Sequence, residues 1–372
     1  MSGFIRRCAA AAVLGAGAMS AWAQNVPPPP ATTAHVSADF SRVDEAAAEY
    51  LRKSGLPGAG VMVIEGGRVV YEKYYGSYDE TTVVSLASAS KWLSGAALVA
   101  LQEKGKLDLD DKVSTYVKQF GADPAQPRAG ITIRQCFNHT SGLPGEFLAA
   151  EAPRLTLEEA VAKIAGVELV SAPGSEFRYG GVSMRVAGRC AEVAAEKEWR
   201  DIFEETIAGP LKMDSTTYGR FEAMKNPNLA GGGRSTLRDY GRFMRMLLGG
   251  GELDGARVLS PEGVKELLRD ETGGVPIARA SVGRRAGNGK SSYGVGCWVD
   301  QKDAQGETIT ASSPGAFGFL PMINTEKGIA AVWMIEDRKR VRNTLKDLPD
   351  MAQVLKDALK VGMPSTAEPQ AK

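Results

Sequence analysis

The chain has 372 residues and carries 45 lysines and arginines against 44 aspartates and glutamates, which gives a formal charge of +1. A chain so evenly balanced offers no electrostatic argument for nucleic acid or a lipid surface as its partner. Its two histidines, His35 and His139, form no cluster with cysteines at the spacing of a zinc site. We therefore expect neither a metal nor another cofactor.

The first residues follow the pattern of a secretory signal peptide. Arg6-Arg7 gives a basic start, residues 9–20 form an apolar run, and Ala21-Trp22-Ala23 resembles a cleavage site. The run is shorter than the ~20 residues that span a bilayer, so we expect a cleaved signal over residues 1–23 and no stable membrane anchor. Export by the Sec or the twin-arginine route would place the protein in the periplasm or outside the cell. Cleavage would remove two arginines and no acidic residue, and so lower the formal charge from +1 to −1.

Composition divides the rest of the chain into three parts. Residues 24–38 contain four consecutive prolines, which predicts an extended linker. Ordered structure is expected over residues 39–360, which is enough for one large domain or two medium-sized ones. Residues 361–372 are polar and contain proline, and we expect them to form a disordered tail.

The hydrophobic pattern and the turn residues predict a definite order of elements. In chain order they are a helix from Phe40 to Leu51, a hairpin of Gly58–Glu65 and Arg68–Tyr75 turned by Gly66-Gly67, a mostly helical stretch from Ser88 to Ala280, strands at Tyr293–Asp300, Thr308–Ser312, Phe317–Ile323 and Gly328–Ile335, and a helix from Arg342 to Val361. The clearest helix start is Thr236-Leu237-Arg238-Asp239, which has the sequence of a capping box. That helix ends at Gly249-Gly250-Gly251.

This order predicts an α+β fold. Strands at both ends of the chain would form one antiparallel sheet flanked by helices, with a mostly helical region inserted between them. We assign a sheet lobe to residues of about 39–85 and 290–360, and a helical lobe to residues of about 86–289. A nucleophile placed where the sheet hands over to the helices would lie in the cleft between the lobes, which is a usual place for a site.

The sequence Ser88-Ala89-Ser90-Lys91 stands at this handover and occurs nowhere else in the chain as a Ser-x-x-Lys motif. It opens a long apolar stretch from Trp92 to Leu101, and on a helix Ser88 and Lys91 would be neighbours on one face. A lysine held beside a serine can take the hydroxyl proton and so activate the nucleophile. Serine and lysine are common on protein surfaces, so a single four-residue match can also arise by chance. The alternative is that this pair has no catalytic role.

Cleavage of the signal would leave Cys136, Cys190 and Cys297, each inside an apolar segment. An odd number of cysteines cannot form a complete disulfide framework. We expect all three to be buried thiols, because a free cysteine behaves as a small apolar residue.

Several further motifs follow the serine in a fixed order. They are Leu86 to Lys91, Thr132 to Pro144, Pro173-Gly174 leading to Phe177-Arg178-Tyr179, Leu211-Lys212-Met213, Ala230 to Gly233 with Ser235-Thr236 and Asp239, and Tyr293 to Gly296. Together they resemble the serine β-lactamase and penicillin-binding-protein superfamily, in its class C-like and esterase branch. The resemblance covers roughly residues 40 to 360 and implies a β-lactamase/transpeptidase-like fold.

The resemblance also implies roles for individual residues. Ser88 would be the acylated nucleophile, Lys91 its base, and Tyr179 the group that passes a proton to the leaving group and later activates water. The segment that contains His139 shapes a turn in this superfamily, so we expect a structural histidine there. The amides of Ser88 and Ala316 would form the oxyanion hole.

Two motifs depart from the superfamily pattern. Its usual Tyr-x-Asn is here Tyr179-Gly180-Gly181, so the asparagine that helps to hold a substrate amide is replaced by Gly181. Its Lys-Thr-Gly or His-x-Gly motif corresponds to Ser313-Pro314-Gly315, which keeps the glycine and loses the cation. We expect Gly181, Ser313 and Gly315 to line the substrate site.

Without that cation, only Lys91 remains to stabilise an ionised Tyr179, so the two groups would share one proton. We expect neutral Lys91 to act as the base and activity to be highest on the alkaline side. The sequence therefore predicts an exported serine hydrolase that acts on small esters. The alternatives are a D-amino-acid amidase or peptidase, a weak β-lactamase, or a protein that binds penicillin or senses cell-wall fragments without turnover. The sequence predicts no oligomeric state.

Overall fold

The structure is a computed structural model that describes residues 40–219, 225–281, 290–339, 341, 344 and 353–355. The described residues belong to one compact unit. The predicted signal peptide over residues 1–23, the linker over 24–38 and the tail over 361–372 lie outside the described residues, as does most of the helix predicted from 342 to 361.

Most of the described α-helices lie between the early strands and the late ones. The α-helices are α1 (Ser41–Ser54), α2 (Ser90–Glu103), α3 (Val113–Tyr116), α4 (Ile133–Phe137), α5 (Leu157–Ala165), α6 (Val182–Ala195), α7 (Trp199–Phe203), α8 (Leu237–Leu248) and α9 (Pro261–Leu268). The strands are β1 (Gly58–Glu65), β2 (Arg68–Gly76), β3 (Val84–Ser85), β4 (Phe177–Arg178), β5 (Thr217–Tyr218), β6 (Gly233–Ser235), β7 (Glu252–Leu253), β8 (Ala256–Arg257), β9 (Ile277–Arg279), β10 (Trp298–Lys302), β11 (Thr308–Ser312), β12 (Leu320–Asn324) and β13 (Ile329–Met334).

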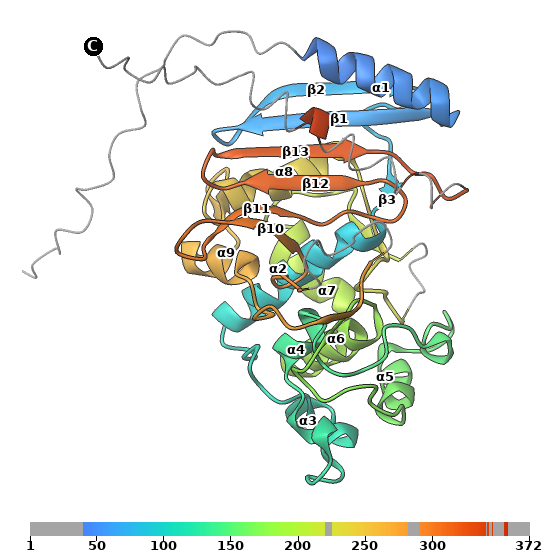
Figure 1. Cartoon of the computed structure of the whole chain (residues 1–372), viewed down its shortest axis with the longest axis vertical. Coiled ribbons are helices and arrows are strands. Elements are labelled where there is room, and N and C mark those ends of the chain that lie inside the picture. Colours follow the sequence, from blue (N-terminus) through green and yellow to red (C-terminus); the bar gives the residue numbers. More distant parts are fainter. Residues whose placement is uncertain are drawn as a thin grey trace, which may run out of the picture. The chain divides into compact units, whose positions relative to one another are not determined.

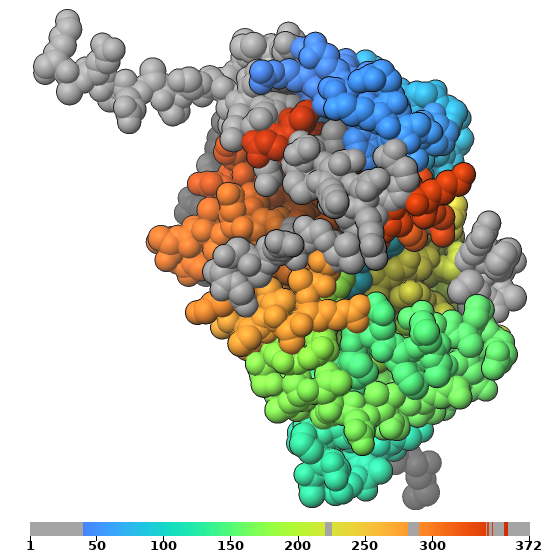
Figure 2. All heavy atoms as spheres, turned by 45° about the vertical axis from the view of Figure 1, so that its right-hand side comes forward, coloured from blue at the N-terminus to red at the C-terminus, as the bar shows by residue number. Residues whose placement is uncertain are grey.

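One six-stranded sheet is built from both ends of the described chain. Its order is β10-β11-β12-β13-β1-β2, and every neighbouring pair is antiparallel. The early strand β1 lies beside the late strand β13, with Val61 opposite Trp333 (Figure 1). In Figure 2 the blue N-terminal residues lie at the top beside red C-terminal residues, and the green residues from the middle of the chain lie below. The predicted α+β fold, with a sheet from both chain ends and a helical region between, is confirmed.

The N-terminal hairpin forms where the sequence predicts it. β1 and β2 are joined by Gly66 and Gly67, whose φ angles are 55° and 76°. Two positive φ angles in a two-residue loop are those of a type I′ turn, whose twist matches that of the flanking strands. The register shift between Val63 and Ile64 leaves Val70 of β2 without a partner and so marks a bulge in β2.

Both faces of the sheet are covered, because side chains of a strand alternate between its faces. Val61 and Val63 of β1 join the core under α1, while Met62 and Ile64 join the larger core that contains the helical region. α1 lies along β1 and β2, and α8 lies against β1 and β13 on the other face (Figure 1). The sheet is therefore the middle layer between the N-terminal helix and the inserted helices.

α8 begins at the predicted residue, but only half of its capping box forms. The side chain of Thr236 accepts a hydrogen bond of 3.1 Å from the amide of Asp239. The carboxylate of Asp239 instead accepts hydrogen bonds from the Ser215 amide at 2.8 Å and the Thr216 hydroxyl at 2.9 Å. The Asp239 side chain thus ties the start of α8 to the segment before β5.

The strand predicted from Tyr293 begins five residues late, because β10 starts at Trp298. The residues between them turn against α2. A Cβ added to Gly95 of α2 would lie 1.9 Å from the carbonyl oxygen of Val295, and one added to Gly296 would lie 2.1 Å from that of Lys91. This close backbone approach replaces the sheet hydrogen bonds that the apolar pattern predicts.

The strand predicted from Phe317 also begins late, at Leu320. The amide of Gly315 donates a hydrogen bond of 2.7 Å to the carbonyl of Phe319, which closes a tight turn over the intervening residues. Because residues 317–319 lie in this turn, they are not part of β12. The last strand of the sheet, by contrast, matches its predicted range to within one residue at each end.

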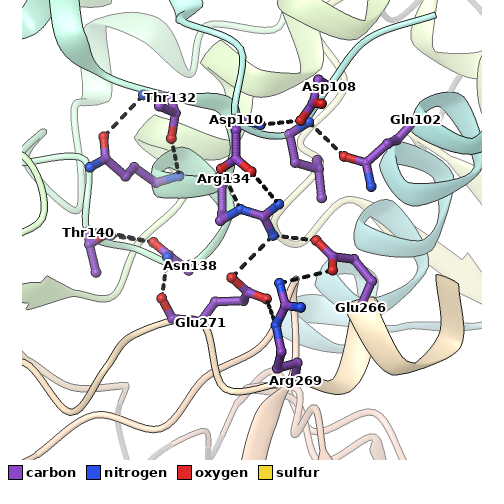
Figure 3. Close-up of polar contacts among 12 residues, drawn as sticks. Gln102, Asp108, Asp110, Thr132, Arg134, Asn138, Thr140, Glu266, Arg269 and Glu271 are labelled. Carbon is purple, nitrogen blue, oxygen red and sulfur yellow. Dashed lines mark hydrogen bonds and ion pairs between the residues drawn. The ribbon is translucent and has the colours of Figure 1, made fainter. Parts of the chain in front are cut away.

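Arg134 of α4 joins three segments of the helical region (Figure 3). Its guanidinium pairs with Asp110 at 2.7 Å, with Glu266 of α9 at 2.5 Å and with Glu271 at 3.2 Å. The side-chain Nδ2 of Asn138 donates a hydrogen bond of 3.0 Å to the backbone carbonyl of Glu271. Burial raises the pKa of Glu271, and Arg134 acts against this shift. The cluster thereby holds the end of α4 and the residues that follow it against the segment around Glu271.

The three cysteines in the described part of the chain, Cys136, Cys190 and Cys297, are free and fully buried, as predicted. Burial raises the pKa of the Cys136 and Cys190 thiols. A neutral buried thiol is a poor nucleophile, so these cysteines serve as apolar core residues. Among the described residues, no helix has the length and apolar character needed to cross a membrane.

We predict that Arg134→Met lowers the free energy of unfolding by about 3 kcal/mol, because Glu266 and Glu271 lose their shared cation in a half-buried setting. Urea unfolding at pH 7 measures the change. Arg238→Met is the matched control, since the ion pairs of that arginine are exposed, and we expect it to cost at most about 1 kcal/mol. Equal losses in the two variants would contradict the structural role of the cluster.

Candidate active site

Ser88 lies in a tight turn between the short strand β3 and the buried helix α2. β3 ends at Ser85, residues Ala87–Ala89 form a single 3₁₀ turn, and α2 begins at Ser90. Ala87 has a φ of 46°, a strained value for a residue with a side chain. Ser88 itself is half-buried, whereas Ala87 and Ala89 on either side of it are buried.

The neighbouring Ser90 holds this turn in place, a role that sequence reasoning missed. Its hydroxyl donates a hydrogen bond of 2.6 Å to the carbonyl of Ala87 and accepts one of 2.9 Å from the amide of Gly233. The amide of Leu86 also donates to the Gly233 carbonyl at 2.9 Å. The strained turn is therefore tied to β6 on both sides of the nucleophile.

Lys91 is buried beside Ser88, as the Ser-x-x-Lys spacing predicts. Its Nζ lies 3.1 Å from the Ser88 Oγ and 2.7 Å from the carbonyl oxygen of Ala230, and only 3% of the residue is exposed. Burial lowers the pKa of Lys91 to about 7. Because removal from water disfavours the ammonium form, a large fraction of this amine is neutral near neutral pH. A neutral amine at this distance can accept the hydroxyl proton.

Tyr179, which lies between β4 and α6, faces Lys91. It follows β4, and its amide donates a hydrogen bond of 2.9 Å to the carbonyl of Arg279. Its ring stacks on Trp298 with a centroid distance of 5.6 Å and an interplanar angle of 19°. The Nζ of Lys91 lies 4.6 Å from the centre of the ring. The structure thus brings Ser88, Lys91 and Tyr179 together, with Trp298 as a support that sequence reasoning missed.

His139 has a structural position behind this group. Its ring lies between those of Phe177, Tyr179 and Tyr293, at centroid distances of 5.3, 4.6 and 5.0 Å. Both ring nitrogens are buried without a hydrogen-bond partner among the described residues. Burial, with a smaller effect of the Lys91 charge, holds the pKa of His139 well below its usual range. A neutral imidazole without a hydrogen bond to Ser88 cannot serve as its base in this arrangement.

The segment Ser313 to Ala316 covers the other side of the nucleophile. The hydroxyl of Ser313 lies 3.1 Å from the Ser88 carbonyl oxygen. A Cβ added to Gly315 would lie 2.2 Å from the carbonyl oxygen of Leu86, so only glycine allows this approach. No hydrogen bond to another described residue uses the amides of Ser88 and Ala316. Two backbone donors beside the nucleophile are what an oxyanion hole requires.

Gly181 lies at the N-terminus of α6, close to the carbonyl group that binds Lys91. Its amide donates to the carbonyl of Gly145 at 3.0 Å. A Cβ added at this position would lie 3.3 Å from the Cβ of Ala230. The position therefore borders the site, as the sequence predicts, and offers no side-chain hydrogen bond to a substrate.

A family model described as Beta-lactamase matches residues 43–356, which is most of the chain. The chain belongs to the β-lactamase family. Membership accounts for the order of motifs around Ser88, Tyr179 and Gly315, and it confirms the resemblance found in the sequence. The protein is accordingly a serine hydrolase of the β-lactamase family, with a β-lactamase/transpeptidase-like fold.

Three relatives illustrate the likeness. A structural neighbour from Bacteroides dorei DSM 17855 is 32% identical, with a TM-score of 0.77, and the match covers 86% of this chain and 98% of that one. Protein flp of Staphylococcus aureus (strain MW2) is 28% identical over 48% of this chain and 38% of its own length. The D-alanyl-D-alanine-carboxypeptidase/endopeptidase AmpH of Escherichia coli (strain K12) is 30% identical over 47% of this chain and 49% of its own length. The match thus spans less than half of each of these two curated relatives.

We predict that Lys91→Met raises the free energy of unfolding by about 1–4 kcal/mol at pH 6 and by less at pH 9. The folded-state pKa of about 7 lies below the value of about 10.4 expected for an unfolded chain, so the unfolded state binds the extra proton between these values. The destabilising effect of Lys91 is therefore complete below pH 7 and decreases as the pH rises toward 10. Urea unfolding at both pH values measures it.

Lys104→Met serves as the control for this prediction, because Lys104 is exposed at the C-terminal end of the same helix. We expect the control to change stability little at either pH. A lower free energy of unfolding for Lys91→Met at both pH values would contradict the prediction that the buried amine destabilises the folded protein.

Proposed function

We propose that the protein hydrolyses small carboxylic esters through an acyl-enzyme formed on Ser88. The observation that carries this proposal is the buried contact of 3.1 Å between the Lys91 amine and the Ser88 hydroxyl, with the pKa of Lys91 lowered to about 7. A serine with a base of this pKa is equipped for nucleophilic attack at neutral pH.

In the acylation step, the Ser88 Oγ bonds to the ester carbonyl carbon and its proton passes to neutral Lys91. The negative charge that develops on the carbonyl oxygen is stabilised by the amides of Ser88 and Ala316. The bond between the carbonyl carbon and the alcohol oxygen then breaks. The departing alkoxide takes the proton from Lys91, with Tyr179 as the relay.

In the deacylation step, water attacks the acyl carbon and gives a proton to the pair formed by Lys91 and Tyr179. The bond to the Ser88 Oγ breaks, and Oγ receives that proton back. Before each attack Lys91 and Tyr179 hold one proton between them, either as neutral lysine with neutral tyrosine or as ammonium with phenolate. During each step they hold the proton of the serine or the water in addition, until the leaving group takes it. The Lys91 amine, 4.6 Å from the Tyr179 ring, stabilises the phenolate in the second state.

Esters are favoured over amides because two groups that would hold an amide substrate are missing. Gly181 supplies no side-chain amide, and Ser313 supplies a hydroxyl directed at protein carbonyl groups in place of a cation. An alkoxide also leaves more readily than an amine, so an ester needs less help from these groups. A weak β-lactamase activity or penicillin binding without turnover would use the same serine.

The second candidate is a D-amino-acid amidase or peptidase. The likeness to AmpH, whose name describes a D-alanyl-D-alanine carboxypeptidase and endopeptidase, favours it. Both candidates share the acyl-enzyme on Ser88 and differ in the leaving group. Our proposal includes export to the periplasm or the medium, on the basis of the signal-like residues 1–23.

We expect the purified protein to hydrolyse p-nitrophenyl acetate and Ser88→Ala to lose this activity, because no other described hydroxyl lies against a buried lysine in this way. Steady-state release of nitrophenol measures turnover, and a labelled penicillin incubated with both proteins tests for a covalent adduct. Ser175→Ala, a change at an exposed serine outside the site, is the matched control and keeps full activity.

Ester turnover that survives in Ser88→Ala would overturn the assignment of the nucleophile. A lasting penicillin adduct on the unaltered protein without ester turnover would contradict the esterase proposal. It would favour a protein that binds penicillin without turnover. Faster turnover of a D-alanyl peptide than of the ester would favour the peptidase over the esterase.

The pH profile follows from the lowered pKa of Lys91. We predict that kcat/KM for the nitrophenyl ester rises with pH through an apparent pKa of about 7 and reaches a plateau above it, because only neutral Lys91 accepts the Ser88 proton. Rates are measured in matched ionic strength and corrected by the Ser88→Ala protein at each pH. A plateau centred at or below pH 6 would show that Lys91 is not the base.

A further inference from the structure

Arg185 is a buried arginine that lacks a close partner. Only 3% of the residue is exposed, and its Nε is buried without a hydrogen bond. The nearest described acidic oxygen, from the largely exposed Glu151, lies 3.8 Å from Nη1 and is too far for a hydrogen bond. A guanidinium has five N–H donors, and leaving them unsatisfied out of water is costly.

Arg134 shows how a half-buried arginine of this protein is normally satisfied. It contacts three carboxylates, each within 3.2 Å. Arg185 makes no comparable contact with any described residue, yet its terminal nitrogens are not sealed from solvent in the way that its Nε is. Its guanidinium is therefore held in place, open at one end, and free to bind a group that comes from outside.

The open end of Arg185 borders the active site. Arg185 lies one helical turn after Gly181 in α6, and helical side chains point back toward the N-terminus. A Cβ added to Gly181 would lie 3.8 Å from the Arg185 Nη1 and 3.3 Å from the Cβ of Ala230, whose carbonyl oxygen binds Lys91. Because position 181 is glycine, it places no side chain of its own between this guanidinium and Ala230.

Asn228 supplies a second donor to the same space. Its Oδ1 lies 3.9 Å from the position of a Cβ on Gly181 and accepts a hydrogen bond of 3.0 Å from the Ala230 amide. This bond directs its Nδ2 elsewhere, and no described residue accepts from it. A Cβ added to Gly231 would lie 3.8 Å from that Nδ2 and 3.7 Å from the carbonyl carbon of Ala87. The free amide donor thus lies between Arg185 and the nucleophile turn.

We propose that Arg185 and Asn228 bind a carboxylate of the substrate in the space that Gly181 leaves open beside Ser88. A planar carboxylate can accept two parallel hydrogen bonds from a guanidinium and a further one from an amide. The inference rests on the proposed ester hydrolysis at Ser88 and narrows its substrates to esters that carry a negative charge. The carboxylate belongs either to the acyl group or to the leaving group.

Three substrates separate these cases: p-nitrophenyl acetate, mono-p-nitrophenyl succinate with an acyl-side carboxylate, and 4-acetoxybenzoate with a carboxylate on the leaving group. The quantity compared is the ratio of kcat/KM for a charged ester to that for the neutral ester, which a general loss of structure does not change. We expect Arg185→Met to lower this ratio at least about tenfold for one of the two charged esters. The ester affected tells which side of the substrate the subsite binds.

Two further variants sharpen the test. Gly181→Asn keeps the charge of Arg185 but fills the space before it, and we expect it to lower the same ratio. Arg189→Met is the matched control, because Arg189 lies one turn further along α6 and pairs with Glu158 and Glu192 away from position 181. We expect the control to keep the ratio within about twofold.

An unchanged ratio for both charged esters in Arg185→Met would overturn the proposal. A lower melting temperature of that variant together with an unchanged ratio would identify Arg185 as a structural residue. If the unaltered protein hydrolyses none of the esters, the proposed function fails, and the subsite is judged by binding alone. Monomethyl succinate should then raise the melting temperature of Ser88→Ala but not of Ser88→Ala with Arg185→Met, and the absence of any shift in the first protein would overturn the inference.

Discussion

The amine of Lys91 lies out of water, 3.1 Å from the Ser88 hydroxyl, and its burial constrains every segment around it. The Ala230 carbonyl oxygen holds the amine from one side, and the backbone at Gly296 closes over the same residue. Each contact excludes water and so lowers the pKa of Lys91. The strained turn at Ala87 and the stacked Tyr179 then bring the reacting groups to this amine.

The acid-base centre and the substrate-binding surface of this site differ in how closely they follow the β-lactamase family. The serine, lysine and tyrosine keep the family pattern, whereas Gly181 and Ser313 replace groups that would hold an amide. Arg185, one turn from Gly181, brings a positive charge to the space that the missing asparagine leaves. On our proposal, chemistry and recognition are therefore separable, because they depend on different residues.

The sequence predicted the features that depend on local pattern. Apolar, β-rich runs and the turn residues between them located β1, β2, β11 and β13. The spacing of Ser88 and Lys91 placed both beside one helix start. It failed where distant backbone segments meet, as in residues 293–297, whose apolar pattern is that of a strand although they turn against α2. The roles of Trp298 and Arg185 were also missed, because stacking and a lack of partners arise only from the folded arrangement.

The sheet unites the first and last strands of the described chain, and this has a consequence for how the enzyme matures. β1 pairs with β13, more than 250 residues later, so a long loop must close before the sheet is complete. The segment that shields Lys91 also comes late in the chain, just before β10. An unfinished chain leaves the amine in water, charged and unable to take a proton. The basic amine beside Ser88 is therefore complete only when the late segments have folded onto the early ones.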